Sequence, residues 1–259
     1  MPSFFKLLPA AGLLVCACAG VVDQSALEKK VFTANKKWKK EIAATQNTAY
    51  LVRFAASGPK GKASGSLEVY WLAGDTVILF SPGLFGKGSL RGRWVLGESF
   101  LVYFPREKSY YKGSWEDFLL GIKSQTLDVD SLIFGILSRR VFWARTDSLV
   151  PEWKERNWVL GDRLGSWERE FIFNRRGWLS GMNWKHGLLS VRAEAEMSHK
   201  PQEIPLVRRL EWEYFMQEAK AKFEVERMVV NAEIPASKKN FKIPGDAVQL
   251  EKIEINEEP

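Results

Sequence analysis

The sequence has very little cysteine and histidine, and this scarcity limits the chemistry open to it. Two Cys and two His occur among 259 residues, and both cysteines, Cys16 and Cys18, lie near the start of the chain. A structural zinc site takes four ligands, drawn mainly from Cys and His. Cys18 is a lipidation candidate and Cys16 precedes it, so no other Cys would remain and the count excludes such a site. His186 and His199 are isolated and fit surface or turn positions better than catalytic ones. We expect no metal and no other cofactor.

Hydrolase motifs are also missing. No Gly-x-Ser-x-Gly segment occurs. Residues 57–60 (Ser-Gly-Pro-Lys) match Ser-x-x-Lys, but Gly and Pro make this segment a turn, and that chemistry needs the start of a helix. The acids Glu168 and Glu170 stand at i and i+2, a spacing too common to indicate a glycosidase. We therefore expect a protein that is not an enzyme.

The apolar run at the start of the chain is too short to cross a membrane. Leu7–Ala17 has about 11 residues, whereas a membrane-spanning helix needs about 20. A short segment with one positive charge precedes it, so residues 1–17 are predicted to be a signal peptide. The run ends in Val-Cys-Ala-Cys-Ala, which resembles a bacterial lipobox with Cys18 as its lipidated residue. Cys16 does not fit, because Val15 would occupy the position of a small residue.

The anchor and its neighbours suggest a location. Residues 18–25 would be a lipidated tether, and seven residues of it, Ala19–Ser25, reach at most about 25 Å. By resemblance to the sorting rule of enteric bacteria, Ala19 after Cys18 favours the periplasm-facing side of the outer membrane. The alternative is an ordinary secretory signal that happens to contain two Cys.

Charge and aromatic content narrow the class of partner. The net charge is +7, with 11 Trp and 16 Phe. A basic protein favours anionic partners such as lipid head groups or nucleic acid, but no zinc-finger, helix-turn-helix or RRM signature supports nucleic acid. The aromatic residues suit a large β core or a surface that binds apolar ligands.

Short alternating runs predict a sheet for most of the chain. A helix over Ala26–Ala44, with an apolar stripe and a lysine-rich outer face, precedes a strand near Asn47–Ala56 and a meander over Leu67–Gly113. The lysines would be solvated or would contact anionic lipid heads. Strands resume from Trp153, and each has one apolar and one polar face. We count about 10 or 11 strands, a sheet so large that it must curl or close.

Two helices between the meander and the later strands are candidates for a cover over the sheet. Ser114 is a predicted N-cap for the first, and the second runs over about Asp130–Arg139 with apolar residues on nearly all sides. A helix so apolar must cover something. The predicted lid residues, which would line a lipid cavity, are Trp115, Phe118, Leu119, Ile133, Phe134 and Leu137.

The loop Ser81–Ser89 carries two large apolar residues where turns are usually polar. Leu84 and Phe85 stand between Gly83 and Gly86. They would insert into a membrane or, alternatively, fold back over the mouth of the barrel as a plug.

The order of these features resembles the lipoprotein-localisation family, LolA and LolB. The most specific local match is the segment 80–86 (Phe-Ser-Pro-Gly-Leu-Phe-Gly), which is similar to the receptor's membrane-inserting loop. The resemblance implies a mainly β fold, an unclosed antiparallel β-barrel with an N-terminal helix and a helical lid, over residues 26–234. Residues 235–259 are a C-terminal extension that the resemblance does not place.

The same resemblance implies a function. The protein would accept acyl chains of lipoproteins or phospholipids in an apolar cavity and help to insert them into the outer membrane. A periplasmic LolA-like carrier is a candidate partner, and we expect a monomer. The alternative is a structural envelope lipoprotein with a filled barrel and no lipid transfer.

The lipobox gives a first testable prediction. Cys18→Ala should release the protein from membranes, because the acyl chains contribute about 0.8 kcal/mol per buried CH₂. Cys16→Ala is the matched control and should leave attachment unchanged. Metabolic labelling with a fatty acid measures both, and labelling that survives Cys18→Ala would contradict the prediction.

Overall fold

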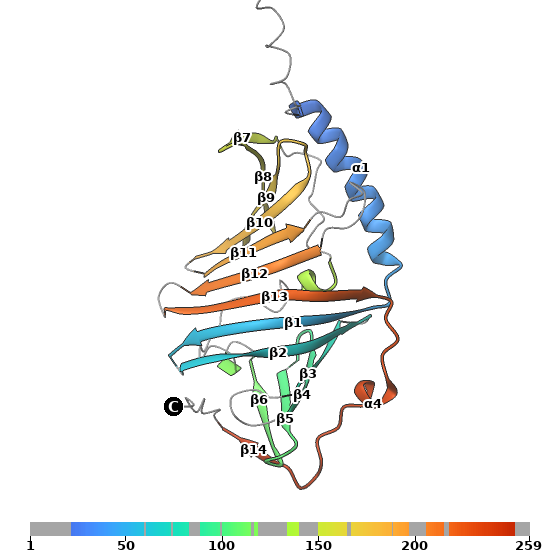
Figure 1. Ribbon diagram of the computed structural model, residues 1–259, viewed down its shortest axis with the longest axis vertical. Helices are drawn as coiled ribbons and strands as arrows, with labels where there is room; N and C mark the ends of the chain where they lie inside the picture. Colours follow the sequence, from blue (N-terminus) through green and yellow to red (C-terminus); the bar gives the residue numbers. More distant parts are fainter. Residues whose placement is uncertain are drawn as a thin grey trace, which may run out of the picture.

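Alternating apolar and polar residues place one face of each strand toward a common interior. The computed structural model describes residues 22–59, 61–73, 75–82, 89–98, 100–114, 117–118, 134–139, 150–164, 167–187, 189–196, 206–214 and 218–251. Over these residues the chain forms a 14-stranded sheet, preceded by one long helix (Figure 1).

The helices and strands follow in chain order. They are α1 (Gln24–Ala43), β1 (Asn47–Gly58), β2 (Gly61–Leu72), β3 (Thr76–Ser81), β4 (Leu90–Val95), β5 (Phe100–Phe104), β6 (Ser109–Gly113), β7 (Glu152–Lys154), β8 (Asn157–Leu164), β9 (Trp167–Phe173), β10 (Leu179–His186), β11 (Leu189–Glu196), β12 (Leu206–Tyr214), β13 (Ala219–Val230), α4 (Ala236–Lys239) and β14 (Val248–Leu250). Residues 117–118 and 134–137 are also helical.

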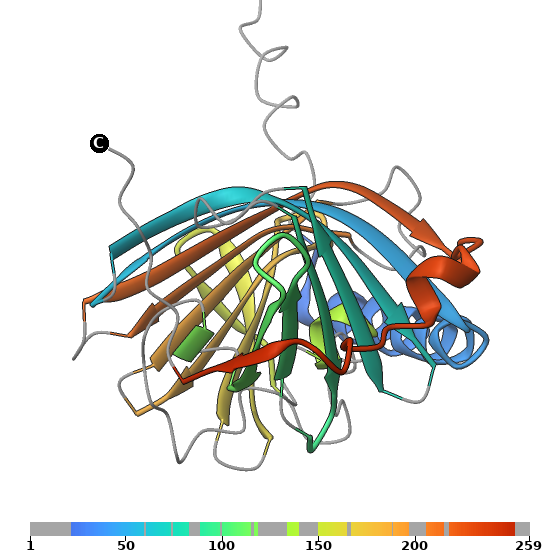
Figure 2. The same cartoon turned by 90° about the horizontal axis from the view of Figure 1, so that it is seen from below.

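The strand order shows that the barrel is open. It runs β14-β6-β5-β4-β3-β2-β1-β13-β12-β11-β10-β9-β8-β7, so β14 and β7 lie at opposite ends. The paired strands are antiparallel, apart from the parallel pair of β14 and β6. Figure 2 shows the sheet curved into an arch. The unclosed antiparallel barrel predicted from the sequence is confirmed.

Strand β2 begins earlier than predicted. Its first half consists of small residues (Gly-Lys-Ala-Ser-Gly-Ser), which have little intrinsic preference for strands. They pair nonetheless with the end of β1, where Gly58 is opposite Gly61 and Phe54 is opposite Gly65. Pairing with β1 in the long hairpin, and not the local residue preference, therefore determines where β2 begins.

A bulge in β13 corrects the predicted inward face of this strand. The sequence pattern puts Val229 on the apolar face, but Val229 is exposed. Leu51 pairs with Arg227 whereas the next residue, Val52, pairs with Val225, so Glu226 is the extra residue. One extra residue moves each later side chain to the opposite face. Met228 therefore faces the interior in place of Val229.

Helix α1 packs along one end of the sheet. Asp23 caps it by accepting a hydrogen bond from the backbone N–H of Ala26 at 2.8 Å. The predicted stripe is confirmed, since Leu27, Val31, Trp38 and Ile42 are all buried. In the turn between β9 and β10, Gly177 has a φ of 72°, and a Cβ there would lie 3.1 Å from Leu27. Glycine thus permits both the turn and the close approach of the helix.

The C-terminal extension, which the family resemblance did not place, adds the edge strand of the sheet, β14, at the start of the strand that the sequence suggests near Val248–Ile255. After β13 it passes through α4 and reaches β6, where β14 pairs in register from Val248 opposite Ser109 (Figure 1). Lys108 Nζ lies 3.1 Å from Asp246 Oδ2 at this junction. Because β14 covers the edge of β6, the backbone groups of β6 on that side are not open to pairing with another chain.

Lys238 in α4 fastens the extension to the sheet. Its ammonium group donates hydrogen bonds to Glu68 and, at 2.8 Å, to the Tyr70 hydroxyl. It also lies 5.1 Å from the centre of the Phe80 ring. The hydrogen bonds from Lys238 and from Tyr70 hold the pKa of the Glu68 carboxyl below its usual value.

This contact predicts a response to acid. A carboxylate whose pKa is lowered on folding stabilises the fold above its unfolded pKa, about 4.3 for Glu. That contribution is lost as the pH falls through the lower folded pKa. Lys238→Met should therefore shift the Glu68 titration to higher pH in carboxyl NMR, and Lys239→Met, one residue further on, is the control. An unchanged Glu68 titration in Lys238→Met would contradict the contact.

Candidate functional site

An apolar cavity lies on the inner side of the sheet. Its volume is about 140 Å³. The lining side chains come from strands β1 to β5, from β12 and β13, and from the two short helical segments. They are Tyr50, Val52, Leu67, Val69, Val77, Leu79, Leu90, Trp94, Phe100, Phe118, Ile136, Leu137, Arg139, Leu206, Val207, Leu210, Trp212, Phe223, Val225 and Met228. All but a few of these are aliphatic or aromatic, so the cavity suits a hydrocarbon group.

The cavity is small for a lipid site. An engineered cavity of about 150 Å³ in another protein holds one benzene, and pockets for larger ligands span about 300–1,000 Å³. The space of about 140 Å³ therefore holds only a short part of an acyl chain. A whole chain requires the covering segments to move away from the sheet.

The described part of the predicted lid covers this cavity. Phe134 is 2% exposed and meets Trp94 edge-to-face, with ring centres 4.8 Å apart. Phe118 is buried and meets Phe100 in the same way at 5.2 Å. Leu137 is half-buried and lines the cavity. Figure 2 shows residues 117–118 and 134–137 under the arch of the sheet. Trp115, Leu119 and Ile133, the other predicted lid residues, lie outside the described residues.

The predicted cap of the first lid segment is present. The backbone N–H of Asp117 donates to Ser114 Oγ at 3.1 Å, as expected for an N-cap. Tyr111 at the end of β6 then donates its hydroxyl to Asp117 Oδ2 at 2.7 Å. These bonds fix the start of the covering segment to the sheet, and so they position Phe118.

Two polar side chains, which sequence reasoning missed, lie in the otherwise apolar lining. The Tyr50 hydroxyl donates to the backbone oxygen of Leu137 at 2.6 Å and so ties β1 to the cover. Burial raises the pKa of the Tyr50 phenol well above its usual value. Arg139, 7% exposed, donates from Nη2 to Thr45 Oγ1 at 2.9 Å. The sequence did contain a signal that could have identified Arg139, because this residue is a cation at the end of an otherwise apolar predicted helix.

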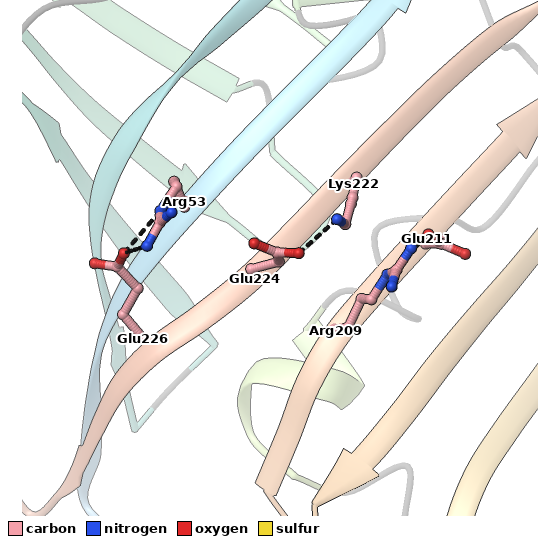
Figure 3. Close-up of polar contacts among 6 residues, drawn as sticks. All are labelled: Arg53, Arg209, Glu211, Lys222, Glu224 and Glu226. Atoms are coloured by element: carbon pink, nitrogen blue, oxygen red, sulfur yellow. Dashed lines mark hydrogen bonds and ion pairs between the residues drawn. The ribbon is translucent and has the colours of Figure 1, made fainter.

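The outer face of the sheet is polar and internally paired. Figure 3 shows three pairs on β1, β12 and β13: Arg53 with Glu226, Lys222 with Glu224, and Arg209 with Glu211. Lys220 and Glu213 add a fourth at 2.6 Å. Exposed pairs of this kind contribute little to stability. They do balance the charge of the outer face, so this face is a poor candidate for an anionic partner.

Helix α1 carries the basic surface instead. Lys29 and Lys36 flank Phe32, which is 60% exposed, on the side of the helix away from the sheet. Lys37 pairs with Glu41 at 3.5 Å and Lys30 donates to the backbone oxygen of Arg176 at 2.9 Å. No helix in the described part of the chain is long and apolar enough to span a bilayer.

Of the remaining sequence candidates, the structure describes Ser57 and His186, and they lie on different strands. Ser57 lies in β1, not at the start of a helix, and His186 lies at the end of β10 with its ring 5.5 Å from Trp167. Among the residues described, no three of His, Cys, Asp and Glu are grouped closely enough to hold a metal. Cys18, Leu84, Phe85 and His199 lie outside the described residues.

Comparisons with known proteins bear on the fold. Neither the models of known protein families nor the curated protein sequences match this chain. A solved DUF1329 family protein from Desulfovibrio piger matches with a TM-score of 0.50 and 8% identity, over 83% of this chain and 97% of that chain. At this identity the similarity shows a shared fold.

Two weaker structural matches are a candidate outer-membrane lipoprotein-sorting protein domain from Vibrio parahaemolyticus and a LolA superfamily protein from Nitrosomonas europaea. The first has a TM-score of 0.44 at 8% identity and covers 83% of this chain and 97% of that chain. The second has a TM-score of 0.44 at 13% identity and covers 83% and 96%. The fold that the predicted resemblance implied, an unclosed antiparallel sheet with a helical cover, is the fold that the described residues form.

The covering contact gives a prediction for stability. Phe134→Ala should lower the free energy of unfolding by about 3–5 kcal/mol, the usual cost of removing a buried Phe ring. Phe32→Ala is the matched control, because its ring is exposed and surface substitutions stay within about 0.5 kcal/mol. Urea denaturation measures both. Equal, small losses in the two variants would show that residue 134 does not pack against the sheet.

Proposed function

We propose that the protein binds acyl chains in the cavity under the sheet and helps to place lipids or lipoproteins in the outer membrane. The observation that carries this proposal is the apolar cavity of about 140 Å³, which lies between the inner face of the sheet and Phe118, Ile136 and Leu137. Burying hydrocarbon in such a site contributes about 0.8 kcal/mol per CH₂.

The proposal includes a membrane-bound setting. Cys18 would carry the lipid anchor, and the short tether would keep the barrel near the bilayer. The basic face of α1 around Lys29, Phe32 and Lys36 has the charge and the exposed ring to rest on anionic head groups. A periplasmic carrier of the same fold is a candidate donor of cargo.

A second candidate function is a structural envelope lipoprotein that transfers no lipid. The specific observation in its favour is the cavity volume, which is below the usual range for ligand sites. The two candidates differ in whether the cover can move from the sheet to admit a whole chain.

Lipid binding by the cavity is tested with the Cys18→Ala protein, so that no covalent acyl chain competes. Native mass spectrometry should find co-purified lipid, and added fatty acid should change the fluorescence of Trp94 and Trp212, which line the cavity. Leu210→Trp, which fills the space, should abolish both signals. A folded protein that takes up no lipid would support the structural candidate instead.

Transfer is a separate prediction and concerns the loop with Leu84 and Phe85. If these residues insert into the membrane, each contributes about 1.5–3 kcal/mol on full burial, enough to orient a tethered protein. Leu84→Glu with Phe85→Glu should then keep the melting temperature and lipid binding but fail to deliver cargo to liposomes. A large fall in melting temperature with intact delivery would show that the loop is a plug.

A further inference from the structure

Arg139 stands out because its charge has no carboxylate partner among the described residues. Its side chain is 7% exposed and lines the apolar cavity. The hydrogen bond to Thr45 uses Nη2 alone, and the buried Nε has no hydrogen-bond partner. A guanidinium has five N–H donors and stays protonated in proteins, so this site holds a permanent positive charge with unused donors.

The groups around Arg139 do not neutralise it. Thr45 is neutral, and its own hydroxyl donates to the backbone oxygen of Glu41 at 3.0 Å. The Glu41 carboxylate, which acts on Arg139 electrostatically, pairs with Lys37 at 3.5 Å, and its side chain is 41% exposed. The Tyr50 hydroxyl is kept in its neutral form by burial, which raises its pKa.

A buried charge without a partner is costly. Removing one partner from a buried ion pair destabilises proteins by about 3–5 kcal/mol, because the remaining charge is left uncompensated. The cost shows in Arg139 itself, since burial lowers the pKa of its guanidinium. A second buried arginine, Arg169 in β9, avoids this cost by pairing with Asp162. Arg139 therefore lacks a partner that the fold supplies elsewhere.

We propose that the cavity binds an anionic amphiphile, with the hydrocarbon chain among the apolar lining residues and a carboxylate or phosphate head group on Arg139. The inference rests on the proposed lipid binding and names the class of ligand. An arginine fork matches both head groups through two parallel hydrogen bonds. Neutral lipids, by contrast, would leave the charge uncompensated and should bind more weakly.

The test compares ligands of equal chain length on the full chain with Cys18→Ala. Octanoate and octyl phosphate carry the anionic head groups, octanol is neutral, and the three share one chain length, so any extra space that the chain needs is the same for all. Binding is followed by fluorescence of the lining residues Trp94 and Trp212. A charge-assisted hydrogen bond contributes about 1.5–3 kcal/mol, so one anionic ligand or both should bind about tenfold or more tightly than octanol. The stronger of the two identifies the head group.

Variants assign the preference to Arg139. Arg139→Met should lose it, binding octanol and the anions within about twofold of each other, while Arg139→Lys should keep part of it. Arg209→Met removes an equal charge from the outer face, where Arg209 pairs with Glu211, and should keep the full preference. Octanol binding by Arg139→Met also shows that the cavity is intact.

The outcomes separate the inference from the proposed function. If octanol binds the unsubstituted protein as tightly as both anions do, the assignment of an anionic ligand is wrong, and this comparison needs no variant to fold. If Arg139→Met retains the preference, Arg139 is not the recognition group. If none of the three ligands binds, lipid binding itself is wrong and the inference falls with it.

Discussion

One constraint governs the architecture: a sheet of 14 strands that does not close has a single apolar face, which must be covered. Helix α1 covers the end near β9 and β10 through Leu27 and Trp38. The segments that carry Phe118 and Phe134 cover the central strands through edge-to-face contacts with Phe100 and Trp94. A small closed barrel of about eight strands can fill its interior with its own side chains. Here the cover is a separate layer, so space remains where the layers do not meet.

Charged side chains are paired on the outer face of the sheet, whereas the cation beneath the inner face is not paired with a carboxylate among the described residues. On the outer face, cations and anions alternate across β1, β13 and β12 and neutralise one another in water. Under the inner face, Arg139 of the covering segment lies among the apolar residues that line the cavity and has no carboxylate partner among the described residues. The same residue type is inexpensive in the first setting and costly in the second, because the local dielectric differs. The unpaired charge therefore lies in the interior of the described structure, where its cost is highest.

Much of the fold could be predicted from local pattern, and the failures have physical causes. The stripe of α1, the β5 strand and the cap at Ser114 follow from periodicity and short-range hydrogen bonding. The start of β2 could not be predicted in this way, because its residues are held in the strand by pairing with β1 across the hairpin. Nor could Val229 be placed correctly, since a bulge at Glu226 reverses the alternation. Of the residues predicted for the lid, Phe118 and Leu137 line the cavity and Phe134 packs against Trp94, and their role as a lid stays a prediction. Tyr50 and Arg139 were missed, because they meet at the cavity only when β1 and the covering segment, which are distant in the sequence, come together in the fold.

The parallel strand at the edge of the sheet has a consequence for the order in which the chain can fold. Tyr110 in β6 bonds Gln249 in β14 across 139 positions of sequence, and Arg53 in β1 meets Glu226 in β13 across 173. During synthesis or passage across a membrane, β6 and β1 therefore emerge long before their partners. Non-local pairings of this kind are slow to form. Strand edges that are still unpaired are prone to pair with other molecules. The first half of this protein therefore completes these two pairings only after residues 226 and 249 are available.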